Sequence, residues 1–174
     1  MIRRRRQTAL KTQRFTGGAL LWVPKPLLKF SPPAAKSGTI ARMPQIQLGA
    51  KLEERLLVTG EEAIDFLGLE SARVLATPYL VGHLEYVCRN LVKPMLEDGY
   101  DTVGTHLDLN HLAATPVGMA VTFVAEILSV EERRVNFRVQ AYDEKEKIAE
   151  GAHQRFVVNV ARFAARLAEK AATR

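Results

Sequence analysis

The sequence predicts an α+β fold in which an antiparallel sheet wraps around one long buried helix. Residues 77–96 are apolar over more than half of a helix circumference, which is typical of a buried helix. Residues 103–160 follow the two-residue period of strands, and their turns are short and charged. A plausible first strand, 52–58, precedes the helix. One strand, a buried helix and four consecutive strands indicate a sheet that packs on a helix.

The predicted central helix has clear start and stop signals. Thr77 is of a type that caps helix N-termini, and Pro78 fits the first helical position, where its missing N–H costs nothing. Gly99 offers a stop, although Pro94 can kink or end the helix earlier. Glu85 interrupts the apolar surface. It either reaches solvent at the edge of the apolar stripe or is held in a cleft for acid/base or nucleophilic chemistry, because an unpaired buried carboxylate is costly.

The residues after Gly99 predict four strands, over 103–111, 118–130, 133–142 and 147–160. In the first, the odd-numbered positions from 103 to 111 are expected to face the helix, which leaves Gly104 on the opposite side. A helix is predicted over 161–173, and residues 61–67 are expected to form a short helical lid with Phe66 and Leu67 facing inward. Such a sheet leaves edges that commonly pair with another subunit, so a homodimer or higher homo-oligomer is expected.

Charge divides the chain into a basic extension, 1–42, and a domain, 43–174. The extension holds ten of the 25 Lys and Arg residues and no acidic residue, so 15 basic and 19 acidic side chains remain in the domain. The domain therefore lacks the basic face expected of a nucleic-acid-binding protein. The extension is expected to be a disordered tail; a transit-type presequence and an upstream extension of the reading frame, with Met43 as the start, are alternatives.

Composition also excludes several kinds of site. The single cysteine, Cys88, allows no internal disulfide and no CxxC metal site, and a buried thiol on the apolar helix is expected. The four histidines lack metal-ligand spacing, so neither a metal nor another cofactor is expected. No apolar run approaches the roughly 18 residues of a membrane span. A cytoplasmic protein is expected, or an organellar one if residues 1–42 are a transit peptide.

Three separate segments carry an unusual combination of residues. They are TPYLVGHLE at 77–85, TVGTHLDLNHLAATPVG at 102–118 and AEGAHQR at 149–155. Together they resemble the hotdog-fold thioesterases of the fluoroacetyl-CoA thioesterase-like family, over about residues 50–160. The block VGT…HxAATPxG is the most specific part. The resemblance implies a hotdog fold, an acyl-CoA substrate and hydrolysis of a short or small acyl thioester.

The resemblance also implies a set of site residues. In that family a Thr, a Glu on the central helix and a His on the following strand form the catalytic set, which corresponds to Thr77, Glu85 and His111. A glycine amide and an arginine that help to bind the thioester or CoA correspond to Gly104 and Arg155. Taken singly, Thr77 has an ordinary explanation as a helix cap, and His111 as a structural hydrogen-bonding residue at a strand end.

These residue types suit thioester hydrolysis. Glu85 can attack the carbonyl to form an acyl-enzyme anhydride, or can activate water directly. His111 is suited to move the proton because imidazole titrates near neutral pH. Thr77 can orient the carboxylate or donate to an oxygen, and a backbone N–H near Gly104 or at the helix start can supply the oxyanion site.

Alternative functions remain open at this point. Fluoroacetate-specialised members have a Phe-rich lid ahead of the Thr, whereas the stretch 66–73 holds the single Phe66, so fluoroacetyl specificity is not expected. A hydratase or dehydratase of the same fold would bring an Asp and a His close together on a helix-and-loop motif, and that pairing is absent. A non-catalytic acyl-CoA sensor would need an attached DNA-binding or partner domain.

Overall fold

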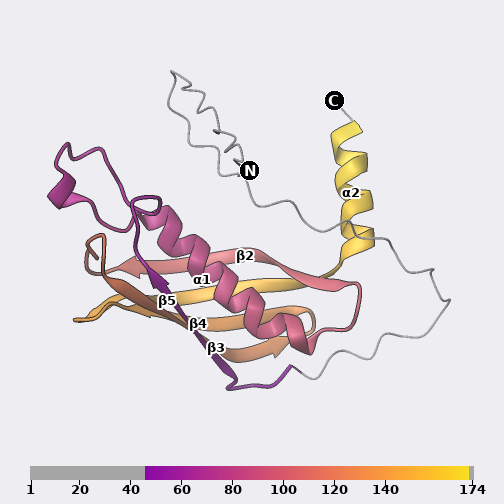
Figure 1. Cartoon of the computed structure of the whole chain (residues 1–174). Coiled ribbons are helices and arrows are strands. Elements are labelled where there is room, and N and C mark those ends of the chain that lie inside the picture. Colours follow the sequence, from indigo (N-terminus) through magenta and orange to yellow (C-terminus); the bar gives the residue numbers. More distant parts are fainter. Residues whose placement is uncertain (1–45, 173–174) are drawn as a thin grey trace, which may run out of the picture. The chain divides into compact units, whose positions relative to one another are not determined.

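The computed structural model describes residues 46–172, which form a five-stranded antiparallel sheet with a long helix lying across one face (Figure 1). The basic extension predicted for residues 1–42 lies outside the described residues. The strands are β1 (Lys51–Leu57), β2 (Tyr100–His111), β3 (Ala120–Glu131), β4 (Arg134–Tyr142) and β5 (Lys147–Asn159). The helices are α1 (Thr77–Val92), α2 (Val160–Ala172) and two 3-10 turns, η1 (Glu70–Ala72) and η2 (Lys93–Met95). The sheet order is β1-β3-β4-β5-β2, and the predicted α+β hotdog arrangement is confirmed.

Helix α1 is buried because its apolar side chains cover a wide part of its surface. The buried side chains are Leu80, Leu84, Val87, Cys88, Leu91 and Val92. They pack with the inward side chains of the sheet, among them Phe123, Ile127, Phe137 and Val139. Each such side chain contributes about 1.5–3 kcal/mol through its burial. Helix α1 ends at Val92, and Pro94 lies in the following η2, so the earlier of the two predicted stops operates.

The predicted alternation of the β4 side chains is confirmed, since Val135, Phe137, Val139 and Ala141 are all buried. Helix α2 follows β5 directly, and none of its residues is buried. Leu167 on this helix is 51% exposed. The four consecutive strands begin and end within three residues of their predicted positions.

The predicted phase of β2 is wrong in the first half of the strand. Gly104 faces α1, because a side chain at this position would meet the carboxylate of Glu85. A β-bulge between Gly104 and His106 adds one residue to β2 relative to β5, and this reverses which side chains face the helix. Beyond the bulge, Leu109 packs against the core and His111 contacts α1. Gly104 and His111, seven positions apart, thus lie on the same face of the strand.

The predicted helical lid at 61–67 is also wrong. This segment consists of turns and a β-bridge, and Phe66 is 77% exposed. The N–H of Ile64 donates to the carbonyl oxygen of Val74 at 3.0 Å, and the carbonyl oxygen of Glu62 accepts from the N–H of Ala76 at 2.8 Å. Backbone groups that a helix would use are thus bonded to the segment before α1, and seven residues are too few to form a stable helix alone.

Candidate active site

Thr77 begins α1 but does not cap it. The N-cap residue is Ala76, which makes no side-chain cap bond, so the prediction that Thr77 is the cap is wrong. The Thr77 hydroxyl lies 3.0 Å from Nδ1 of His111, at the end of β2. Two of the predicted residues, from segments 34 positions apart, therefore meet in one exposed hydrogen bond.

Glu85 lies on α1, and its side chain is 44% exposed. Its carboxylate oxygens lie 3.7 Å from Nε2 of His153 and 3.8 Å from Nη1 of Arg155, both on β5. The stem of Glu85 is thus held over the sheet while part of the carboxylate stays open to solvent. A carboxylate next to a buried cation and accessible from outside is suited to chemistry on a bound substrate.

Gly104 provides the space that the Glu85 carboxylate occupies. A Cβ atom at this position would lie closer than 3.0 Å to Oε1 of Glu85, and 3.3 Å from both Cδ of Glu85 and Cε1 of His153. Because glycine has no Cβ, the carboxylate can rest directly on the backbone of β2. The bulge at 104–106 gives Gly104 this orientation.

Arg155 is a buried cation with a partner for each of its nitrogens. Only 5% of the residue is exposed. Nε donates to the hydroxyl of Thr102 at 2.9 Å, and Nη2 donates to the carbonyl oxygen of Thr102 at 3.0 Å. Nη1 donates to the carbonyl oxygen of Glu85 at 3.3 Å and lies 3.2 Å from Nε2 of His153. Burial lowers the pKa of Arg155, and the Glu85 carboxylate opposes that shift.

His153 belongs to this group, although the sequence reasoning did not identify it. It is 2% exposed, and its Nδ1 lies 2.8 Å from the carbonyl oxygen of His106. Burial lowers the pKa of His153, and the Arg155 guanidinium lowers it further, so the neutral ring is favoured. The signal that could have found it is the period of a strand, since His153 and Arg155 are two positions apart and share a face.

The predicted residues thus form two groups. Thr77 pairs with His111, while Glu85 lies with Gly104 and Arg155. Thr77 and Glu85 are eight residues apart on one helix, which corresponds to about 12 Å along its axis. Among the contacts of the described residues, none joins His111 directly to the Glu85 carboxylate.

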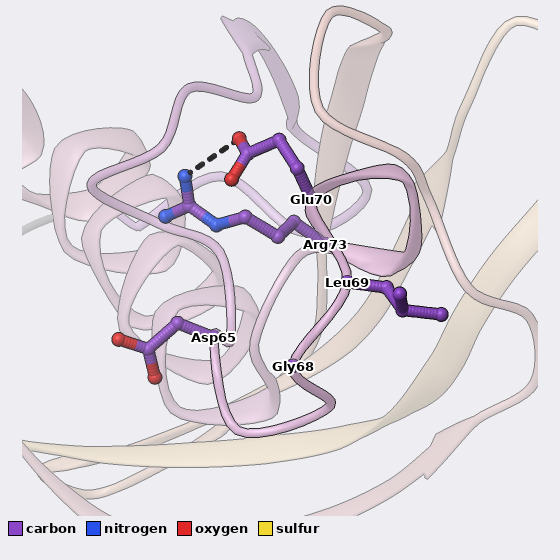
Figure 2. A pocket seen from close by; sticks show the side chains of 5 residues that line it. All are labelled: Asp65, Gly68, Leu69, Glu70 and Arg73. Carbon is purple, nitrogen blue, oxygen red and sulfur yellow. Dashed lines mark hydrogen bonds and ion pairs between the residues drawn. The ribbon is translucent and has the colours of Figure 1, made fainter.

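A hollow of about 450 Å³ lies in the loop before α1 and is lined by Asp65, Gly68, Leu69, Glu70 and Arg73 (Figure 2). Its cation is already bound, since Arg73 donates to Glu70 at 3.1 Å and to the carbonyl oxygen of Gly60 at 2.6 Å. The two acidic side chains of the lining repel anionic groups such as phosphates. This hollow is therefore not assigned to the substrate.

Within residues 46–172, no group of three or more His, Cys, Asp or Glu side chains could hold a metal ion. In the same range, no helix has the length and apolarity needed to cross a membrane.

Known proteins are similar to this chain in sequence and in fold. The family described as fluoroacetyl-CoA-specific thioesterase matches residues 58–161. The fluoroacetyl-CoA thioesterase of Streptantibioticus cattleyicolor is 41% identical over 101 residues, which are 58% of this chain and 73% of that protein. A structure of a fluoroacetyl-CoA thioesterase matches with a TM-score of 0.65 and 35% identity, over 71% of this chain and 96% of that one. A point mutant solved with acetyl-CoA matches with a TM-score of 0.66 and 34% identity, over 71% and 98% of the chains.

Proposed function

Because this chain belongs to the family of fluoroacetyl-CoA-specific thioesterases, we propose that it hydrolyses a short or small acyl-CoA thioester to the free acid and CoA. The observation that carries the proposal is the half-exposed carboxylate of Glu85, which lies on Gly104 beside the buried cation of Arg155. In the reaction the C–S bond of the thioester breaks. Water supplies the hydroxyl group of the acid and the proton of the thiol.

Glu85 is the group proposed to act on the thioester carbonyl. It either attacks the carbonyl carbon to give an acyl-enzyme anhydride or removes a proton from the attacking water. Both routes need an ionised carboxylate that is oriented toward the thioester carbonyl or the attacking water. The nearby guanidinium of Arg155 fixes one side of the carboxylate.

Thr77 and His111 are proposed to complete the site as a hydrogen-bonded pair. His111 shuttles the proton that the departing sulfur needs, and the Thr77 hydroxyl holds the ring or donates to the substrate oxygen. An amide N–H near Gly104 or at the start of α1 supplies the oxyanion site. The role of Arg155 in binding the thioester or CoA stays a prediction. In this structure its guanidinium donates to interior groups of the protein.

We propose further that the two groups meet across a homodimer. Strand β2 is at one edge of the sheet, and an edge strand offers unpaired backbone groups to another strand. Around a two-fold axis at Asp108, antiparallel β2 strands with the bulged Thr105 left unpaired would bring His111 of one copy opposite Gly104 of the other. Each Glu85 would then be close to the Thr77–His111 pair of the second copy.

Mixing two inactive variants tests this arrangement. Glu85→Gln and His111→Ala are each expected to lower kcat by at least about 10²-fold. Refolded together, half of the dimers would be hybrids with one intact site of two, so about one quarter of the wild-type activity would return. The complete absence of recovery, with hybrid dimers detected by native mass spectrometry, would contradict the shared site.

An acyl-CoA panel tests the reaction itself. Thiol release from acetyl-, fluoroacetyl- and longer acyl-CoAs is followed with a thiol reagent, and the Glu85→Gln variant serves as the control. Release from small acyl-CoAs is expected, without a strong preference for fluoroacetyl-CoA. Tight binding of acyl-CoA with no thiol release would support the non-catalytic alternative instead.

A further inference from the structure

The buried ring of His153 has one tautomer that fits its neighbours. Nδ1 lies 2.8 Å from the carbonyl oxygen of His106, and a carbonyl oxygen only accepts, so Nδ1 carries the proton. Nε2 of the neutral ring is then an acceptor. It faces Nη1 of Arg155 at 3.2 Å, and a guanidinium only donates, so this second hydrogen bond fits the same tautomer.

Two further features of the fold fix the ring. The imidazole stacks beside the ring of Phe137, with centroids 6.2 Å apart and an angle of 29° between the ring planes. The carbonyl of His106 directly follows the β-bulge, where the pairing of β2 with β5 is interrupted. The irregularity that turns Gly104 toward Glu85 thus lies beside the acceptor that sets the tautomer of His153.

We propose that His153 is a positioning residue for the catalytic carboxylate, acting through Arg155. Its Nε2 lone pair holds Nη1 of Arg155, while Thr102 holds the other two nitrogens. The guanidinium is thereby fixed beside Glu85. The inference rests on the proposed thioesterase function, and it adds a residue that does not itself touch the substrate, since the side chain of His153 is only 1% exposed.

Two substitutions separate positioning from a merely structural role. In His153→Gln, the longer side chain can bring an amide oxygen to the position of Nε2 and keep an acceptor for Arg155. In His153→Asn, the shorter side chain can still donate to His106 but does not reach Arg155. Each variant keeps one of the two hydrogen bonds and loses the packing of the ring, so the two form a matched pair.

The expected result is a difference in kcat between the variants. His153→Asn lowers kcat by about 10–100-fold, the usual cost of losing a group that orients a functional one, while His153→Gln stays within about threefold of the wild type. KM changes little in either variant. Comparable losses in both variants, with both folded by circular dichroism, or wild-type kcat in His153→Asn, would overturn the proposal.

Two controls keep the inference separate from the proposed function. Nitrogen-15 NMR of the wild-type protein reports the tautomer without any activity assay, and a proton on Nε2 with Nδ1 unprotonated would overturn the inference. Activity of Glu85→Gln tests the proposed function. If Glu85→Gln is inactive while His153→Asn turns over normally, only the role of His153 fails. If the wild type releases no thiol from any acyl-CoA, the function itself fails.

Discussion

Gly104→Ala should lower the activity without lowering the stability. The new Cβ would lie closer to Oε1 of Glu85 than the 3.0 Å that real Cβ atoms keep, so the carboxylate has to move by about 1 Å. That movement should cost little folding free energy, because the atom that the Cβ would meet is at the end of a flexible, half-exposed side chain. Replacing Gly by Ala within a strand also stabilises the folded state by about 0.5–1 kcal/mol, because glycine loses more conformational freedom on folding. A displacement of about 1 Å at a reacting group can cost about 10²-fold in rate, or about 2.7 kcal/mol of barrier.

The assay is kcat for thiol release from the best acyl-CoA, together with a thermal melt. Gly151→Ala is the matched control, since its Cβ would meet the backbone of β2, with Cα of Leu109 at 2.9 Å. Backbone cannot yield as a side chain does, so this variant should lose stability. A Gly104→Ala, Glu85→Gln double variant should be no slower than Glu85→Gln alone. An additive loss, or wild-type kcat in Gly104→Ala, would refute the reasoning.

Two further predictions follow from the contacts of α1 and β5. Thr77→Ala removes the hydrogen bond to His111 but no helix cap, so kcat should fall by about tenfold or more while the melting temperature changes little; a large drop in that temperature would show a capping role. Acidification below about pH 6.5 should destabilise the fold, because the unfolded chain protonates His153 and His83 near 6.5 while burial holds both pKa values lower in the folded state. The loss of stability continues until the pH reaches the pKa values of the folded state. The urea midpoint of unfolding should therefore fall less steeply with decreasing pH in His153→Gln than in the wild type. An equal decline in both proteins would exclude His153 as a source.

The sequence predicted the parts of the fold that depend on local pattern. The apolar surface of α1 and the alternation of Val135, Phe137 and Val139 are periodic, so their burial follows from spacing alone. The predicted lid is absent because the backbone of residues 62–64 is bonded to the segment before α1, a pairing that no local pattern shows. The sequence did not predict a role for His153, because no local pattern distinguishes a buried histidine that belongs to a hydrogen-bond network. Its partners lie on β2 and α1, and only the assembled sheet brings them together.

The bulge of β2 explains why the site could be named from sequence but not built from it. With strict alternation, Gly104 and His111 would face opposite sides of the sheet, and one of them would be excluded from any site beside α1. One extra residue between Gly104 and His106 removes that conflict and directs both toward the helix. Deleting Thr105, the extra residue between them, would leave Gly104 and His111 six positions apart, so both would still face α1 in a regular strand. Such a variant should keep thiol release if it folds, and its loss in a folded variant would show that the bulge does more for the chemistry than set the phase of β2.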